Sequence, residues 1–446
     1  MAPPLGRLSA GRRSFYDAGM TTNTPAQRDG LRRLDASQLA AHQLARFNAL
    51  VAEILPHNSF YADKLGSLHH PLESLDAIAD LPFTFKDELV GKVESGDLAA
   101  NRTYPLERYV RFHRTSGTRG RPMVVMDTAA DWQWWLDGWQ FVLDAAEIGP
   151  EDRCFLAFSF GPFVGFWSAF DAVAARGCLA IPSGGLSTIA RLELIRQNGA
   201  TALFCTPTYA LHLAEVAQQQ KMDIADTNVH RVILAGEPGG SIPSVRQKIE
   251  SAWNAKVIDH TGATEIGPWG FSDEKQRGVY VNEAFFLAEF ISVDSGKPAS
   301  ELELSELVIT TLGRYGAPVI RYRTGDLVRP SWNHNGPCNF VLLEGGVLGR
   351  ADDMLIIRGV NVFPSSVEQI VRGFPEIVEF RMTALKQGQM DQLSVEIEDR
   401  LDRPERVANE LQIRLGLRIE VTSVEIGSLP RFEGKGRRFV DKRYAS

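Results

Sequence analysis

The sequence predicts an α/β protein with a large N-terminal domain of layered α/β sheets and a small C-terminal α+β domain. Three observations lead to this prediction: strands and helices alternate beyond Pro105, the texture of the chain changes near Gly349, and 446 residues exceed what one hydrophobic core usually supports. We expect the large domain over residues 31–349 and the small domain over 350–446. Before them, residues 1–30 are expected to form a flexible extension.

The extension is expected because its first twenty residues are polar and show no apolar periodicity. They carry three arginines but a single acid, Asp17. A targeting tail is one interpretation, and an extension upstream of a true start at Met20 is the other.

The large domain is expected to begin with an amphipathic helix from about Ala36 to Asn58, where apolar residues recur at helical spacing. Farther on, short apolar runs predict strands at Cys154–Phe158, Gly177–Ile181, Ala202–Cys205, Arg231–Ala235 and Lys256–Ile258. The spacing between these runs predicts helices at Ile189–Gln197, Leu211–Gln219 and Pro243–Trp253. Such alternation indicates largely parallel sheets, whose ligands bind beyond the carboxyl ends of the strands.

The small domain is expected to mix short strands with two helices. The predicted strands are Leu355–Ile357, Phe380–Ala384, Leu393–Ile397 and Ile419–Val424, and the predicted helices are Ser365–Val371 and Pro404–Leu415. About a hundred residues is a common size for an independent domain.

The composition disfavours several classes of function. A formal charge of −7 argues against a general nucleic-acid binder, and no apolar run approaches the length of a membrane span. The four cysteines are too widely spaced for a zinc ribbon or a disulfide framework, and three of them sit among apolar residues. We therefore expect buried thiols and a cytoplasmic protein with neither nucleic acid nor membrane as a partner.

The clearest local motif is the segment T-S-G-T-R-G-R-P at residues 115–122. Glycines let a backbone approach a phosphate closely, and hydroxyl and amide groups can bond its oxygens. The spacing is not that of a Walker loop, and an isolated loop of this composition is more often only a loop. The residues expected to contact phosphate are Thr115, Ser116, Gly117, Thr118 and Gly120.

Eight further segments favour phosphate binding by this loop over a purely structural role. They are Leu81–Lys86, Ile181–Gly185, Thr206–Tyr209, Gly236–Pro238, Thr261–Glu265, Arg321–Asp326, Gly349–Pro364 and Leu429–Lys435. In this order they resemble the motifs of the adenylate-forming enzymes, and within them the phenylacetate–coenzyme A ligase family. The last three segments are similar to that family's Y-R-T-x-D, hinge and L-P-R-x-E-G-K motifs. The resemblance covers about residues 36–442 and implies the adenylate-forming fold with a mobile small domain.

The resemblance implies a site for ATP and Mg²⁺. Glu265 would be the metal ligand, because Mg²⁺ prefers oxygen ligands, and Thr264 would donate to the α-phosphate. Asp326 would accept hydrogen bonds from the ribose, and Arg350 would contact the nucleotide. Gly236, Glu237, Pro238 and Thr261 would line the adenine pocket. Thr261 replaces the family's adenine-stacking tyrosine, and Trp269 or a neighbour is expected to compensate.

Two residues are implied to act through motion of the small domain. Asp352 would be the hinge, and Lys435 would reach the site during adenylation and withdraw before the thiol reacts.

The acid pocket is expected near Phe158–Trp167, where the family reads Y-G-Y-G-L-F and this chain has phenylalanine for both tyrosines. Phe158 and Trp167 are equally well read as core residues. The pocket residues that we assign are Lys86, Phe160, Phe163, Phe166 and Gly267.

Together these features predict an ATP-dependent ligase that forms an acyl-adenylate from a small aryl or arylacetic acid and passes the acyl group to coenzyme A. Adenylation motifs alone leave other acceptors open: an amine, a carrier protein, or a deazaflavin that receives AMP. A non-catalytic nucleotide-binding protein is a further alternative, which retention of the acidic and basic site residues disfavours. The expected partners are the acid, ATP and coenzyme A, with a homodimer left open.

Overall fold

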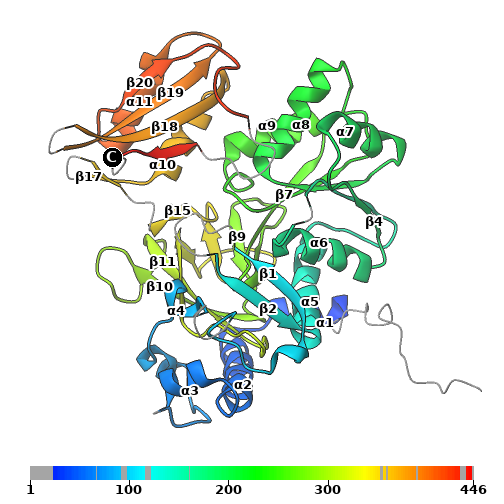
Figure 1. The fold of residues 1–446 in the computed structure, drawn as a ribbon, viewed down its shortest axis with the longest axis vertical. Helices are drawn as coiled ribbons and strands as arrows, with labels where there is room; N and C mark the ends of the chain where they lie inside the picture. Colours follow the sequence, from blue (N-terminus) through cyan, green and yellow to red (C-terminus); the bar gives the residue numbers. More distant parts are fainter. Residues whose placement is uncertain are drawn as a thin grey trace, which may run out of the picture.

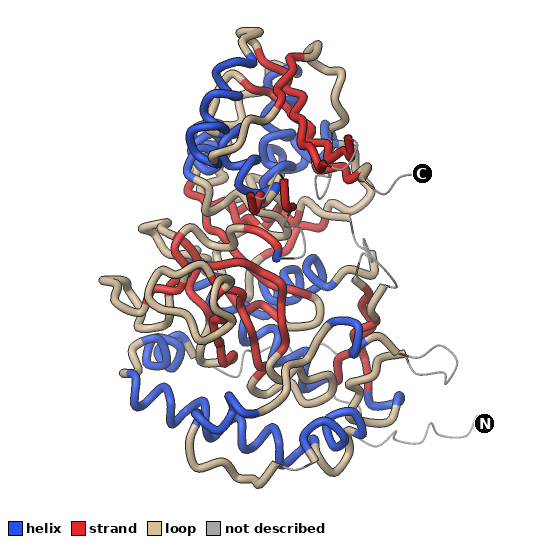
Figure 2. Tube along the Cα trace, turned by 90° about the vertical axis from the view of Figure 1, so that its left-hand side faces the viewer, coloured by secondary structure: helices blue, strands red, loops and turns tan. Residues whose placement is uncertain are grey.

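The computed structural model describes residues 24–66, 68–91, 98–115, 122–159, 161–351, 355–357, 360–387, 390–431 and 438–443. The small domain lies at one end of the molecule's long axis, and helix α2 (Ala36–Ile54) lies at the other (Figure 1). The same division is visible from the side (Figure 2).

A nine-stranded sheet forms the centre of the large domain, in the order β13-β14-β9-β8-β7-β6-β5-β3-β4. One half is parallel and contains β3 (Arg153–Leu156), β4 (Leu179–Pro182), β5 (Ala202–Cys205), β6 (Arg231–Leu234) and β7 (Lys256–Ala263). The other half is antiparallel and contains β8 (Gly267–Phe271), β9 (Gly278–Val281), β13 (Pro330–Ser331) and β14 (Leu342–Glu344). The expectation of largely parallel sheets therefore holds only for the first half.

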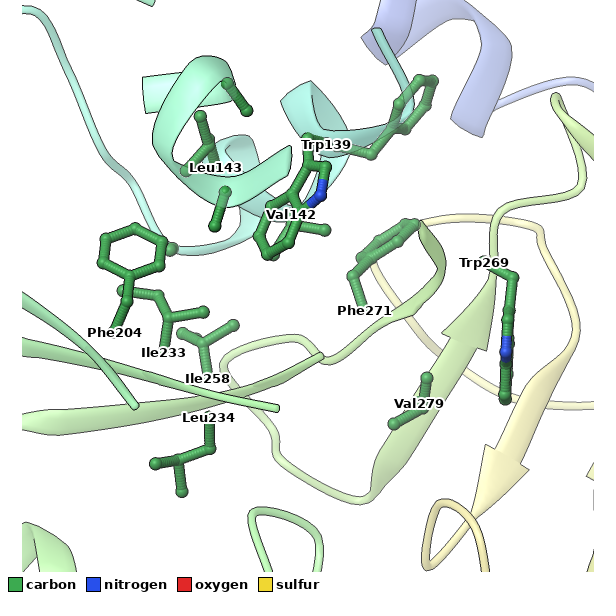
Figure 3. Packing of buried hydrophobic residues seen from close by; sticks show 14 of the residues in the cluster. Trp139, Val142, Leu143, Phe204, Ile233, Leu234, Ile258, Trp269, Phe271 and Val279 are labelled. Atoms are coloured by element: carbon green, nitrogen blue, oxygen red, sulfur yellow. The ribbon is translucent and has the colours of Figure 1, made fainter. Parts of the chain in front are cut away.

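Helices cover this sheet and bury its apolar strands. They are α5 (Ala129–Ala145), α6 (Val164–Ala175), α7 (Thr188–Gln197), α8 (Pro207–Gln219) and α9 (Pro243–Trp253). Figure 3 shows Trp139 and Val142 of α5 beside Phe204 and Ile233 of the parallel strands, within one buried cluster. Continuous burial explains why β5 reads A-L-F-C without polar alternation.

Two smaller sheets complete the large domain. An antiparallel sheet contains β10 (Phe286–Ser292), β11 (Ser305–Thr311), β12 (Tyr322–Val328) and β15 (Gly349–Arg350), and a hairpin contains β1 (Tyr109–Arg114) and β2 (Val124–Thr128). The N-terminal helices are α1 (Pro25–Arg32), α2, α3 (Ser59–Leu65) and α4 (Lys86–Leu89), with 3-10 turns at Leu75–Asp80 and Leu106–Arg108.

The small domain has its own buried cluster, separate from the two clusters of the large domain. Its elements are β16 (Leu355–Ile357), β17 (Val360–Val362), α10 (Pro364–Arg372), β18 (Ile377–Gln387), β19 (Met390–Asp399), α11 (Pro404–Leu415), β20 (Glu420–Ser423) and β21 (Phe439–Asp441). Four of these strands form one sheet in the order β20-β19-β18-β21. Every strand and helix predicted here from the sequence is present, while the boundary between 349 and 350 stays a prediction.

The structure differs from the sequence-based expectation at the N-terminus. Part of the expected extension 1–30 is helix α1, whose Thr24 cap and buried Arg28 tie it to the body. Arg28 donates to both carboxylate oxygens of Asp144 on α5, at 2.6 and 2.9 Å. The expected helix 36–58 is present as the single helix α2, which ends earlier, at Ile54, and the Asn58 side chain then caps the start of α3.

The cysteines and the helices bear on two expectations from composition. All four cysteines are free and buried, which confirms the prediction of buried thiols. No helix in the described part of the chain combines the length and apolar character needed to cross a bilayer.

Candidate active site

The hairpin β1–β2 presents the expected phosphate loop, and Thr115 closes its base. The Thr115 backbone N–H donates to the carbonyl of Met123 at 2.9 Å, and the Met123 N–H donates to the Thr115 hydroxyl at 2.9 Å. The Thr115 oxygen therefore already has a structural partner, and its hydroxyl proton is what it can still offer to an anion. Residues 116–121 lie outside the described residues, and with them the expected Ser116, Gly117, Thr118 and Gly120.

Glu265 lies in the tight turn between β7 and β8, half-buried, and it is held at two points. The Tyr322 hydroxyl donates to its Oε1 at 2.9 Å, and the Arg314 guanidinium donates to its backbone carbonyl at 2.8 Å. Its other carboxylate oxygen, Oε2, makes no hydrogen bond within the described part of the chain. Burial and the adjacent Glu265 carboxylate raise the pKa of Tyr322, so its hydroxyl keeps the proton that it donates.

Asp326 and Arg350 face each other across the antiparallel pair β12–β15. Arg350 Nη1 donates to Asp326 Oδ1 at 2.9 Å and to the Thr324 carbonyl at 2.7 Å. Both residues lie close enough to Tyr322 for their charges to act on its hydroxyl. Tyr322 is therefore the point around which Glu265, Asp326 and Arg350 gather, although they come from three separate sequence motifs.

Loops that follow β5 and β6 form another part of the site. Glu237 Oε1 accepts a hydrogen bond from the Thr208 backbone N–H at 2.7 Å, at the start of α8. Gly236 and Pro238 beside it are exposed. Thr261 is half-buried on β7, and its register partner is Gly270 on β8. These placements follow the rule that ligands bind at the carboxyl ends of parallel strands.

The sequence suggested Trp269 as a substitute for the missing adenine-stacking tyrosine. In the structure the Trp269 indole is fully buried in the core of the large domain (Figure 3). It is therefore not accessible to a nucleotide in this arrangement.

The expected acid-pocket residues have diverse surroundings. Phe163 precedes α6 and is 42% exposed, while Lys86 is exposed at the start of α4. Gly267 is packed so closely that an added Cβ would lie 2.8 Å from the Trp134 ring. Phe158 is buried, which fits the alternative reading of it as a core residue.

The described residues omit several predicted positions. Phe160, Asp352 and Lys435 lie outside them, as does the side chain of Phe166. Their roles stay predictions from the sequence.

Three residues of this region were not found by reasoning from the sequence: Tyr322, Arg314 and Arg438. Tyr322 lies inside the motif R-Y-R-T-G-D, and this position could have identified it as a site residue. Arg314 is an isolated arginine in a loop and carries no local signal of burial. Arg438 belongs to the small domain but donates to the Thr208 hydroxyl of the large domain at 3.3 Å.

The carboxylates of this region suit Mg²⁺ if substrate and water supply most of its ligands. Within the described residues, no three His, Cys, Asp or Glu side chains come together as a metal cluster. A single carboxylate with an oxygen not engaged in a hydrogen bond, as in Glu265, fits an ion that takes most of its ligands from substrate phosphates and water.

Known protein families match both the large and the small part of the chain. The family described as AMP-binding enzyme matches residues 99–288, and the family described as AMP-binding enzyme C-terminal domain matches residues 359–443. The phenylacetate-coenzyme A ligase of Pseudomonas putida is 30% identical over 436 residues, which cover 94% of this chain and 97% of that protein. The phenylacetate-coenzyme A ligase of Escherichia coli is 31% identical over 447 residues, covering 95% and 99% of the two chains.

Solved structures show a similar fold. A 2-hydroxyisobutyryl-CoA ligase in the postadenylation state, in complex with 2-HIB-AMP, has a TM-score of 0.88 at 24% identity and covers 95% of this chain and 94% of its own. The same ligase in the thioesterification state, with 2-HIB-AMP and CoA, has a TM-score of 0.71 at 25% identity, with 96% and 95% covered.

Proposed function

Since the chain belongs to the phenylacetate–coenzyme A ligase family, we propose that it activates a small aryl or arylacetic acid with ATP and transfers the acyl group to coenzyme A. The observation that supports this most directly is the gathering of Glu265, Asp326 and Arg350 around Tyr322. Residues from three of the motifs that resemble those of adenylate-forming enzymes thereby lie near one another.

The reaction has two half-reactions. In the first, a carboxylate oxygen of the acid attacks the α-phosphorus of ATP, the bond to the bridging oxygen breaks, and pyrophosphate leaves. In the second, the thiol sulfur of coenzyme A attacks the acyl carbon, AMP leaves, and the thiol proton is lost. Both steps depend on positioning and on donors aimed at developing negative charge.

Each residue has a distinct task in this proposal. Asp326 accepts hydrogen bonds from the ribose, with Arg350 holding its carboxylate in place. Glu265 would hold Mg²⁺, which when bound neutralises charge on the phosphates. Thr264 donates to the α-phosphate, and Lys435 supports adenylation from the small domain.

The acid pocket sets the expected preference among substrates. Phenylalanine stands where the family has two tyrosines, so a hydroxylated ring would bury a hydroxyl without its partner, at a cost of about 1–3 kcal/mol. Unsubstituted aryl or arylacetic acids should therefore react more efficiently than their hydroxylated forms.

A substrate screen tests this proposal. Acid-dependent pyrophosphate release and thioester formation would be measured with phenylacetate, 4-hydroxyphenylacetate and decanoate, with Glu265→Gln as an inactive control. We expect the highest kcat/KM with phenylacetate or a similar aryl acid. Highest efficiency with decanoate or the hydroxylated acid would contradict the pocket assignment, and AMP release without a coenzyme A thioester would indicate another acceptor. A homodimer and a cytoplasmic location stay predictions.

A further inference from the structure

Arg314 is a fully buried cation that links two parts of the site. It lies between β11 and β12, and its side chain has no exposed surface. Its Nε donates to Asp127 Oδ1 at 2.8 Å, and its Nη1 donates to the Glu265 carbonyl at 2.8 Å. Asp127 belongs to β2, the strand that leaves the expected phosphate loop.

The Arg314–Asp127 pair supplies geometry more than stability. Removing two charges from water is expensive, so such a pair is weak evidence for a stabilising role. The planar guanidinium instead offers donors at fixed angles, and Trp135 packs under it with 5.4 Å between the Arg314 Cζ and the ring centre. The Arg314 Nε thus contacts β2, and its Nη1 contacts the turn that contains Glu265.

Tyr322 acts on the side chain of the same residue. It is 2% exposed, so its ring is fixed by packing, and its hydroxyl reaches Glu265 Oε1 at 2.9 Å. The backbone and the carboxylate of Glu265 are thus held independently, by residues from two different parts of the chain.

We propose that Arg314 and Tyr322 are positioning residues that together fix the direction of the Glu265 carboxylate toward the bound nucleotide. This inference rests on the proposed function, in which Glu265 holds the cation that accompanies ATP. Neither residue touches the reacting atoms. Their contribution is to keep Oε2 aimed while Oε1 and the carbonyl are occupied.

Tyr322→Phe is the sharpest test, because it removes one hydroxyl and keeps the ring. Tyr280→Phe is a matched control: Tyr280 is fully buried on β9, and its hydroxyl donates to Asp273 Oδ2 at the same 2.9 Å. The probe is Mn²⁺ with ATP and no acid, followed by electron paramagnetic resonance, together with kcat and KM for acid-dependent pyrophosphate release. Thermal stability of each variant is measured in parallel.

We expect Tyr322→Phe to weaken Mn²⁺ binding in the presence of ATP about fivefold to tenfold and to lower kcat by a similar factor, as loss of one hydrogen bond implies. Tyr280→Phe should lose comparable stability but leave both values unchanged. Arg314→Lys keeps the charge but cannot reach Asp127 and the Glu265 carbonyl together, so it should also alter the Mn²⁺ spectrum.

The outcomes separate the inference from the function. If Tyr322→Phe matches Tyr280→Phe in Mn²⁺ binding and in kcat, the positioning role is wrong while the ligase assignment stands. If the wild-type protein neither binds Mn²⁺ with ATP nor releases pyrophosphate with any acid, the proposed function is overturned and the inference with it. Should Arg314→Lys fail to fold, the comparison of Tyr322→Phe with Tyr280→Phe still tests the positioning role.

Discussion

Asp259 is a buried carboxyl group on β7, two residues before Thr261, and it makes stability depend on pH. Its Oδ2 accepts a hydrogen bond from the Ser241 hydroxyl at 2.5 Å. Burial raises the pKa of Asp259 to about 6, although hydrogen bonds from Ser241 oppose that shift. Because the folded protein holds this proton more tightly than the unfolded chain, stability is lost as pH rises from about 4 to about 6.

We therefore predict that Asp259→Asn gains stability relative to the wild type across that interval. The difference in melting temperature should grow from pH 4 to pH 6 and then stay constant, whatever its absolute value. Melting curves at several pH values provide the measurement, with the exposed Asp294→Asn as control. A difference that does not vary with pH would show that Asp259 titrates normally.

Single residues also show how far the sequence could predict the site. Glu265, Asp326 and Arg350 could be proposed as site residues because each lies in a short motif whose neighbours are also recognisable. Arg314 could not, because its burial depends on Asp127, which lies 187 positions away in the chain. Trp269 was a wrong candidate for stacking, since its burial comes from packing that no local pattern reveals.

At the scale of elements, the short strand β15 depends on a glycine in its partner β12. Gly325 has φ +75°, and an added Cβ would lie 2.7 Å from Arg350 Nη2. We predict that Gly325→Ala destabilises the protein by about 1–2 kcal/mol through backbone strain and, in addition, raises the KM for ATP by displacing Arg350.

A second glycine separates these two effects. Gly296 has φ +67°, but an added Cβ there would meet nothing within 4 Å. Gly296→Ala should therefore lose comparable stability, measured by denaturant unfolding, with an unchanged KM for ATP. If both variants bind ATP equally well, the contact between Gly325 and Arg350 does not matter for the nucleotide.

Elements differ in how well the sequence predicted them. Helices α9 and α11 and strand β5 were predicted with their exact bounds, because α9 and α11 begin at a proline and β5 is a continuous apolar run. Strands β8 to β14 were not predicted. These strands pair in an antiparallel manner within two different sheets, and tertiary contacts set that pairing. Glycine-containing stretches such as G-P-W-G-F therefore carry little strand signal on their own.

At the scale of the whole molecule, Arg438 makes a contact between the two domains. This buried side chain pairs with Glu379 of its own domain, at 2.6 and 3.0 Å, and donates to the Thr208 hydroxyl of the large domain. We predict that Thr208→Val slows adenylation about fivefold, as expected for a hydrogen bond of about 1 kcal/mol, because it weakens this arrangement of the domains. Thioester formation from supplied acyl-AMP should be unchanged.

The measurement is two assays on one variant: acid-dependent pyrophosphate release and thioester formation from synthetic adenylate. Thr227→Val serves as control, since the Thr227 hydroxyl donates to a carbonyl within its own loop at 2.7 Å. Equal losses in both half-reactions would mean that Thr208 serves folding and not domain placement.

Lys435 and Asp352 lead to a matching prediction for the mobile small domain. Lys435→Ala should lose adenylation by about 10²–10³ and keep thioester formation from acyl-AMP, because one donor aimed at developing charge is removed. Asp352→Pro should do the reverse, since proline's fixed φ hinders rotation. The same two assays measure both variants, and parallel loss of both activities in Lys435→Ala would refute domain alternation.

The pairing of β12 with β15 also has a mechanical consequence. Strand β15 ends at Arg350, two residues before the expected hinge, and Arg350 holds the carboxylate of Asp326. The β12–β15 pair that holds Asp326, the proposed ribose contact, is thus also the last paired strand of the large domain before the expected hinge. Rotation of the small domain would therefore exert force on the nucleotide site through only a few residues. A nucleotide bound at Asp326 would in turn stabilise the β12–β15 pair against that force.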